Sequence, residues 1–168
     1  MAFEKHVKRG VMQNFGPRKT NLRFGGDNEA NLIRRAQWVF KYNDLPVPGT
    51  SAFEMVVPAG STILSAQLRI LQAFTSTSTT TDLIVGLQDS AGNEIDNDGL
   101  ITAAHATQTA IALVGSMIDG GTGTPGALVG KTIGGTNGEL VVAPTANDLT
   151  AGRAIVYIEY MLPYPAQN

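Results

Sequence analysis

The sequence predicts an all-β protein: an antiparallel two-sheet β-sandwich, jelly-roll-like in form, that follows an extended basic N-terminal arm. Seven or eight short segments alternate apolar with polar residues, and turn residues separate these segments. Charged residues make up only 15% of the chain, whereas glycine (19) and proline (8) are plentiful. No helical pattern recurs between the strand-like segments, which argues against a βαβ arrangement.

Two regions are predicted: an extended arm over residues 1–31 and a β-sandwich domain over residues 32–168. The first region contains single apolar residues without a sustained period, as expected of a segment that supplies little of the core. Nine of the twelve Lys and Arg residues lie within the first 41 positions, which carry a formal charge of +6, and the rest of the chain carries −8. This asymmetry indicates that the arm contacts a partner of negative charge.

The first strand of the sandwich is predicted over residues 35–43. The apolar residues between positions 32 and 40 would also fit one face of a helix. However, Ala36, Trp38, Phe40 and Tyr42 alternate with the residues between them, as in a strand. The aromatic content and the prolines that follow favour extended backbone, so we predict a strand.

Three further strands are predicted before the middle of the chain. Residues 53–57 alternate, and so do the residues from Leu64 to Ile70, whose even-numbered members form an apolar face. Residues 83–88 (LIVGLQ) are apolar on both faces, which predicts a covered central strand. The polar residues 89–93 then predict a turn.

The second half of the chain is predicted to contain one short helix and three strands. The helix is expected over residues 103–107 and a strand over residues 110–114. Residues 119–138 contain eight glycines, which predicts a long surface excursion. The last two strands are expected over residues 139–143 and 154–160, the second of them with clear alternation.

The sequence predicts neither an enzyme nor a cofactor. A catalytic site needs groups that reach one another, such as a nucleophile and its base, and the chain has no Cys and only two His. His6 lies in the arm, which cannot hold a base in a fixed position. His105 has no Ser-His-Asp order or Gly-x-Ser-x-Gly elbow around it, so we expect a surface or satisfied core residue.

No metal site is predicted, although residues 93–99 (NEIDNDG) resemble part of a calcium loop. With Glu94 as position 1, Asp96 and Asp98 fall at positions 3 and 5. Position 1 should be Asp, however, and position 12 falls on His105 where a bidentate Glu is needed. A hydrophilic hairpin tip is the preferred interpretation, with calcium at Asp96 and Asp98 as the alternative. A phosphate loop is not predicted either, because three residues separate Gly126 and Gly130 where the motif has four.

The arm is predicted to dock on an acidic protein surface. Its cations are spaced singly with apolar residues between them, which is typical of an extended interface segment and unlike a polyanion-binding run. Nucleic-acid binding, with aromatic residues stacked on bases, and a solvated arm without a partner are the alternatives. The predicted binding residues are Lys5, Lys8, Arg9, Phe15, Arg18, Lys19, Leu22, Arg23 and Phe24. No apolar stretch approaches the length of a membrane span, so no membrane contact is expected.

Four segments together carry a resemblance to a known class of proteins. They are WVFKYNDLP (38–46), VVPAGS (56–61), LIVGLQD (83–89) after a Thr-rich break, and LTAGRAIVYIEY (149–160). In style and order, residues 35–162 resemble the small β-sandwich structural proteins of tailed bacteriophages. Among these, the chain is most similar to capsid decoration, or cement, proteins. The resemblance supplies no catalytic or ligand residue, because such proteins act through their surfaces.

The resemblance implies a role on the outside of the virion, after synthesis in the host cytoplasm. The partners would be the major capsid protein and further copies of the chain itself, in a trimer or a dimer. The protein would then bridge neighbouring capsid subunits and stabilise the shell, with the basic arm as its strap. The alternatives are a tail, head-to-tail or head-fibre component, and a glycan-binding module for host attachment that would use exposed aromatic residues such as Tyr160 and Tyr164.

Overall fold

The computed structural model describes most of the chain after residue 32. The described residues are 33–45, 55–77, 80–121, 123, 126–146 and 149–162, together with the backbone of two short strands near the N-terminus. The chain divides into two units, Met1–Asn31 and Leu32–Asn168. In the first unit, β1 (Lys5–Val7) and β2 (Gly10–Met12) pair antiparallel, with Lys5 opposite Met12.

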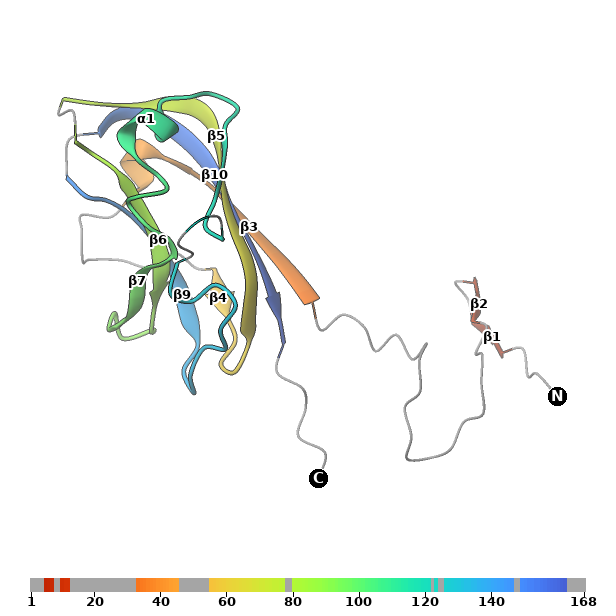
Figure 1. Cartoon of the computed structure of the whole chain (residues 1–168). Helices are drawn as coiled ribbons and strands as arrows, with labels where there is room; N and C mark the ends of the chain where they lie inside the picture. Colours follow the sequence, from red (N-terminus) through yellow and green to blue (C-terminus); the bar gives the residue numbers. More distant parts are fainter. Residues whose placement is uncertain are drawn as a thin grey trace. The chain divides into compact units, whose positions relative to one another are not determined.

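The second unit contains the remaining strands, a 3-10 turn η1 and one helical turn α1 (Figure 1). In chain order they are β3 (Ile33–Lys41), η1 (Tyr42–Asp44), β4 (Val56–Val57), β5 (Thr62–Ser76), β6 (Leu83–Gln88), β7 (Glu94–Ile101), α1 (Gln108–Ile111), β8 (Met117–Asp119), β9 (Gly138–Pro144) and β10 (Leu149–Met161).

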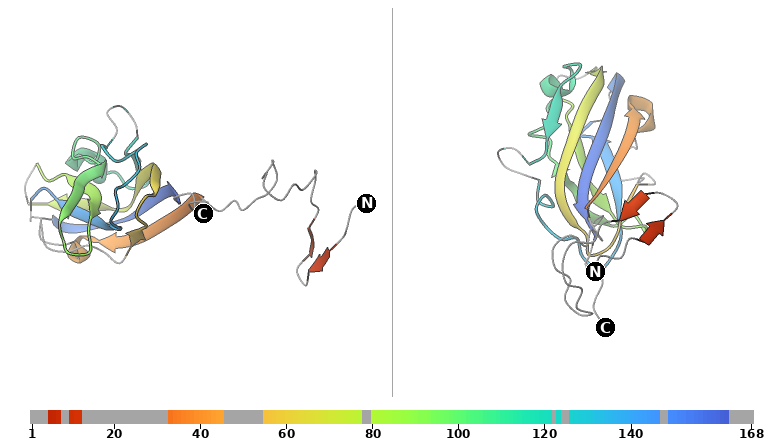
Figure 2. Two further views of the ribbon diagram at one scale, coloured as in Figure 1. Left: turned by 90° about the horizontal axis from the view of Figure 1, so that it is seen from below. Right: turned by 90° about the vertical axis from the view of Figure 1, so that its right-hand side faces the viewer.

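Two four-stranded antiparallel sheets form the sandwich, with strand orders β3-β10-β5-β8 and β4-β9-β6-β7. The right-hand view of Figure 2 shows β5, β10 and β3 running side by side. The strands pair from the outside of the sequence inwards: β3 with β10, β4 with β9, β5 with β8, and β6 with β7. This order is that of one long hairpin rolled up into two sheets, which is the jelly-roll topology. The predicted fold class is therefore confirmed.

The core lies between the two sheets, where the inward residues of the long strands meet. Fully buried side chains alternate along β5, β6, β9 and β10, as the period of two requires. At one margin of the core, the Phe40 ring lies 6.0 Å from that of Phe74, and Trp38 stacks on Phe40 at 4.9 Å between ring centroids. Gly86 lies where a Cβ atom would overlap the backbone of Asp96 and Asn97, so the irregular part of β7 lies directly against Gly86.

Several predicted strands are confirmed within two residues of their ends. β6 spans residues 83–88 as predicted, and β3 is a strand that begins and ends two residues earlier than expected because η1 follows at Tyr42. Of the strand predicted over 53–57, the structure shows only Val56–Val57, and residues 53 and 54 lie outside the described part.

The predicted inward position of Leu64 is wrong. β10 pairs Glu159 with Ser65 and then Tyr160 with Ile63, so Leu64 is an extra residue in a β-bulge. The bulge reverses the phase of the strand, which buries Ile63 completely and leaves Leu64 40% exposed. From Ala66 onwards, the predicted phase is correct.

The predictions for residues 103–114 are also wrong. The helix is α1 at Gln108–Ile111, capped by Thr107, whose Oγ1 accepts a hydrogen bond from the Ala110 amide at 3.3 Å. A turn with positive φ at Gly115 follows, and the strand is β8, farther along.

The glycine-rich residues 119–138 do not form a purely surface excursion. The Gly130 amide donates to the Ile63 carbonyl at 2.9 Å, and the Ile63 amide donates to the Lys131 carbonyl at 3.0 Å. Ile133 is buried as a result and belongs to the core.

Candidate functional site

His105 lies in a local turn. Its Nδ1 atom lies 2.8 Å from Thr102 Oγ1, and its backbone amide donates to the Thr102 carbonyl at 3.0 Å. Within the described ranges, no three His, Asp or Glu side chains gather closely enough to hold a metal ion. Of the helices in the described part, none is long and apolar enough to cross a membrane.

The acidic residues of the calcium-like stretch lie on β7. Burial raises the pKa of Asp96, and Asp98 and Glu94 raise it further through a side-chain hydrogen bond and charge repulsion. The Glu94 carboxylate accepts a hydrogen bond from the Asn97 amide at 3.3 Å. In the preceding turn, hydrogen bonds from Asn93 lower the pKa of Asp89, whose Oδ1 also accepts from the Ala91 amide. One hairpin thus contains two carboxyl groups with opposite shifts.

We expect substitutions of these two carboxyl groups to change stability with opposite signs. A raised folded-state pKa means that ionised Asp96 destabilises the fold above that pKa, so Asp96→Asn should raise the melting temperature at pH 7. A lowered pKa means that ionised Asp89 stabilises the fold, so Asp89→Asn should lower the melting temperature at pH 7. Thermal melts should be compared at pH 7 and at about pH 2.5, where an ordinary carboxyl group is protonated. At the lower pH, the difference in melting temperature between Asp96→Asn and the wild type should vanish, and that between Asp89→Asn and the wild type should shrink. Shifts of the same sign at pH 7 would contradict this assignment.

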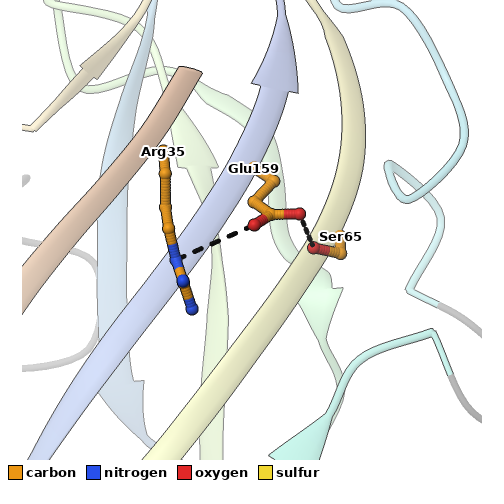
Figure 3. Close-up of polar contacts among 3 residues, drawn as sticks. All are labelled: Arg35, Ser65 and Glu159. Atoms are coloured by element: carbon orange, nitrogen blue, oxygen red, sulfur yellow. Dashed lines mark hydrogen bonds and ion pairs between the residues drawn. The ribbon is translucent and has the colours of Figure 1, made fainter. Parts of the chain in front are cut away.

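The outer face of the β3-β10-β5-β8 sheet carries a polar cluster built from three neighbouring strands. Figure 3 shows Arg35 of β3, Glu159 of β10 and Ser65 of β5 side by side. Arg35 Nε lies 3.8 Å from Glu159 Oε1, and Ser65 Oγ donates to Glu159 Oε2 at 3.4 Å. The Arg35 guanidinium also lies over the Tyr157 ring, 4.7 Å from its centroid. Register explains the arrangement, because Glu159 lies opposite both Arg35 and Ser65.

Apolar side chains lie on the same face and remain exposed. Val39, Met117 and Ile33 are 42%, 51% and 59% exposed, although each belongs to a strand of this sheet. Exposed apolar side chains that lie among arginines are typical of a protein-binding surface.

The binding residues predicted in the arm lie outside the residues whose side chains the structure describes. They are Lys5, Lys8, Arg9, Phe15, Arg18, Lys19, Leu22, Arg23 and Phe24. They stay a prediction. Sequence reasoning did not single out the outer sheet face, although one signal for it exists: Arg153, Ile155, Tyr157, Glu159 and Met161 share the outward phase of β10.

Comparison with known proteins finds similarity in structure alone. No family model and no curated protein matches the chain. A chain of the structure described as "Cyanophage Pam1 capsid asymmetric unit" is 17% identical with a TM-score of 0.55, and the match covers 88% of this chain and 98% of that chain. A chain of the "Capsid of Ralstonia phage GP4" is 14% identical with a TM-score of 0.51, covering 88% and 92%. A chain of the acid-stable capsid of Helicobacter pylori bacteriophage KHP30 is 18% identical with a TM-score of 0.45, covering 79% and 89%.

The likeness to the Pam1 and GP4 chains extends over nearly the full length of those two chains. At these sequence identities, the shared feature is the sandwich fold.

Proposed function

We propose that this chain is a non-enzymatic structural protein of a phage virion that binds the outer surface of the capsid and stabilises it, as a decoration or cement protein. The observation that carries the proposal is the full-length similarity in fold to chains of two phage capsid structures. The resemblance of four sequence segments to phage decoration proteins supports the same role. The partner is then the major capsid protein, and the site of action is the exterior of the virion.

The basic arm, residues 1–31, is the proposed strap to neighbouring capsid subunits. Its cations would face carboxylates of the shell, and Phe15, Leu22 and Phe24 would fill apolar pockets between them. A dimer or trimer of the chain would hold two or three arms on one particle. Each bound arm raises the effective concentration of the others, so modest affinity of a single arm suffices.

Binding to purified particles tests this function. The full chain is mixed with expanded heads assembled without it and, separately, with isolated tails, and each mixture is sedimented. We expect the chain to pellet with heads alone, and decorated heads to release their DNA at a higher temperature than bare heads. Images of decorated heads should show added density on the outer surface. Sedimentation with tails alone would assign the protein to the tail instead.

A further inference from the structure

Three cations on neighbouring strands lie near one another on the outer face of the β3-β10-β5-β8 sheet. Lys41 of β3 lies directly opposite Arg153 of β10, and Arg69 of β5 lies opposite Ile155, two residues along from Arg153. We call Lys41, Arg69 and Arg153 the basic corner. All three side chains are exposed.

Charges of the described residues do not neutralise the basic corner. Throughout the described ranges, the one ion pair within 4.0 Å joins Arg35 to Glu159, and no described carboxylate lies that close to the charged side-chain nitrogens of the basic corner. The nearby Asp44 carboxylate accepts a hydrogen bond from the backbone amide of Lys41 at 2.9 Å, and the Asp119 carboxylate accepts one from the backbone amide of Gly121 at 2.9 Å. Two like charges directly opposite each other destabilise a sheet. The basic corner therefore costs stability in the free protein and is suited to a negative partner.

Apolar residues lie next to the basic corner. Val39 and Ile155 lie opposite each other on β3 and β10, and Met117 lies opposite Arg69. Leu113 and Val114, 59% and 66% exposed, belong to the loop before β8. This loop is held to β5 by hydrogen bonds from the Gly115 amide to the Ile70 carbonyl at 2.8 Å and from the Ile70 amide to the Ser116 carbonyl at 3.0 Å. A fixed apolar surface with cations beside it matches the composition of protein interfaces.

We propose that the basic corner docks on an acidic protein surface of the capsid shell and forms a second anchor in addition to the arm. The inference rests on the proposed function and names the partner chemistry of the sandwich domain. β3 begins at Ile33, soon after the arm ends in the sequence, and Lys41 lies at the other end of this strand, about 27 Å along it from Ile33. Two separate attachment points make simultaneous release rare and so lengthen the time that the protein stays bound.

A different protein fits the basic corner better than a second copy does. The acidic residues Glu94, Asp96 and Asp98 of this chain lie on β7, which belongs to the opposite sheet. A contact between the basic corner of one copy and β7 of the next would be heterologous, and such contacts propagate into open filaments unless the rotation closes a ring. Double-stranded DNA would bind the cations through its phosphates but would bury little of the apolar surface beside them.

Binding of full-length variants to expanded heads assembled without this chain tests the inference. The triple variant Lys41→Gln, Arg69→Gln and Arg153→Gln should bind heads about tenfold more weakly than the wild type, because it loses three charge contacts. The matched pair Arg153→Glu and Lys131→Glu changes the net charge equally, and Lys131 is exposed on a distant turn. We expect the first to weaken binding strongly and the second to change it by less than about twofold. A cooperative melt at or above the melting temperature of the wild type shows that the basic-corner variants fold, because removing like charges that lie opposite each other should not destabilise the sheet.

The outcomes separate this inference from the proposed function. If the wild type does not sediment with heads, both the proposed function and this inference fail. If the wild type binds and the triple variant binds equally well, the basic corner is no anchor while the proposed function stands. Sedimentation velocity without heads provides a further test. A wild-type oligomer that the triple substitution dissociates would assign the basic corner to a second copy. Retention of short DNA that depends on the same three residues would assign it to nucleic acid, and either result overturns the inference.

Discussion

Leu68→Asp is expected to abolish the folded sandwich. Leu68 is fully buried on β5, between Val156 of β10 and Ile118 of β8 on the inner face of the sheet. A carboxylate at this position would lack both water and a counter-charge, and a protonated carboxyl group would lack a hydrogen-bond partner. Taking up a proton at pH 7 and burying the unpaired acid in place of Leu68 together cost an amount comparable to the roughly 5–15 kcal/mol by which a domain is stable. Thermal melting followed by circular dichroism at pH 7 should show no cooperative transition.

The neighbouring residue provides the matched control, with the same substituent on the other face. Gln67→Asp places the carboxylate among Tyr157 and Asp119, its cross-strand neighbours on the outer face. Repulsion from Asp119 in a solvated position costs about 1 kcal/mol or less, so the variant should melt cooperatively a few degrees below the wild type. Equal loss of structure in both variants would show that the face of β5 has been assigned wrongly.

The sequence was sufficient to predict the sandwich wherever a strand follows regular alternation. β10 has its apolar residues at the alternating spacing that burial on one face requires, and the structure buries Ala154, Val156 and Ile158 accordingly. Leu64 is different, because the bulge that exposes it depends on the partner strand. No local pattern distinguishes Leu64 from Ala66, so its position follows only from the pairing of β5 with β10.

Long-range contacts also explain why the segment around α1 was predicted wrongly. The Gln108 amide at the start of α1 donates to Asp82 Oδ1 at 2.8 Å, a contact with a residue 26 positions earlier. Asp82 is held in turn, since its amide donates to Thr145 Oγ1 at 2.9 Å. The helix propensities of residues 103–114 carry no information on these contacts with Asp82 and Thr145. The tertiary contacts therefore contribute to where the helix begins.

The outer sheet face was only partly predictable for the same reason. The outward phase of β10 is visible in the sequence, yet Lys41, Arg69 and Arg153 are separated by 28 and 84 positions. The jelly-roll order brings them to one corner because β10 lies between β3 and β5. Strand order depends on the global fold, so a surface assembled from three strands cannot be derived from any one of them.

Deletion of the arm, residues 1–31, is expected to leave a folded sandwich that no longer holds the capsid. The buried residues of the described core lie between Phe40 and Ile158, and the apolar residues of the arm follow no core-forming period. The melting temperature should therefore stay within a few degrees of that of the full chain. Sedimentation with expanded heads should weaken by about a hundredfold or more, because the basic corner would remain as a single attachment point.

An arm without cations separates the contributions of positive charge and apolar contact. The variant replaces six cations with Gln: Lys5, Lys8, Arg9, Arg18, Lys19 and Arg23. It should bind heads more weakly than the wild type but better than the deletion variant, because Phe15, Leu22 and Phe24 still bury apolar surface that salt does not screen. Raising salt should weaken the wild type only partly for the same reason. Full attachment of the deletion variant would rule out the arm as a strap, and tight salt-sensitive DNA binding by the wild type without head binding would place the protein inside the particle.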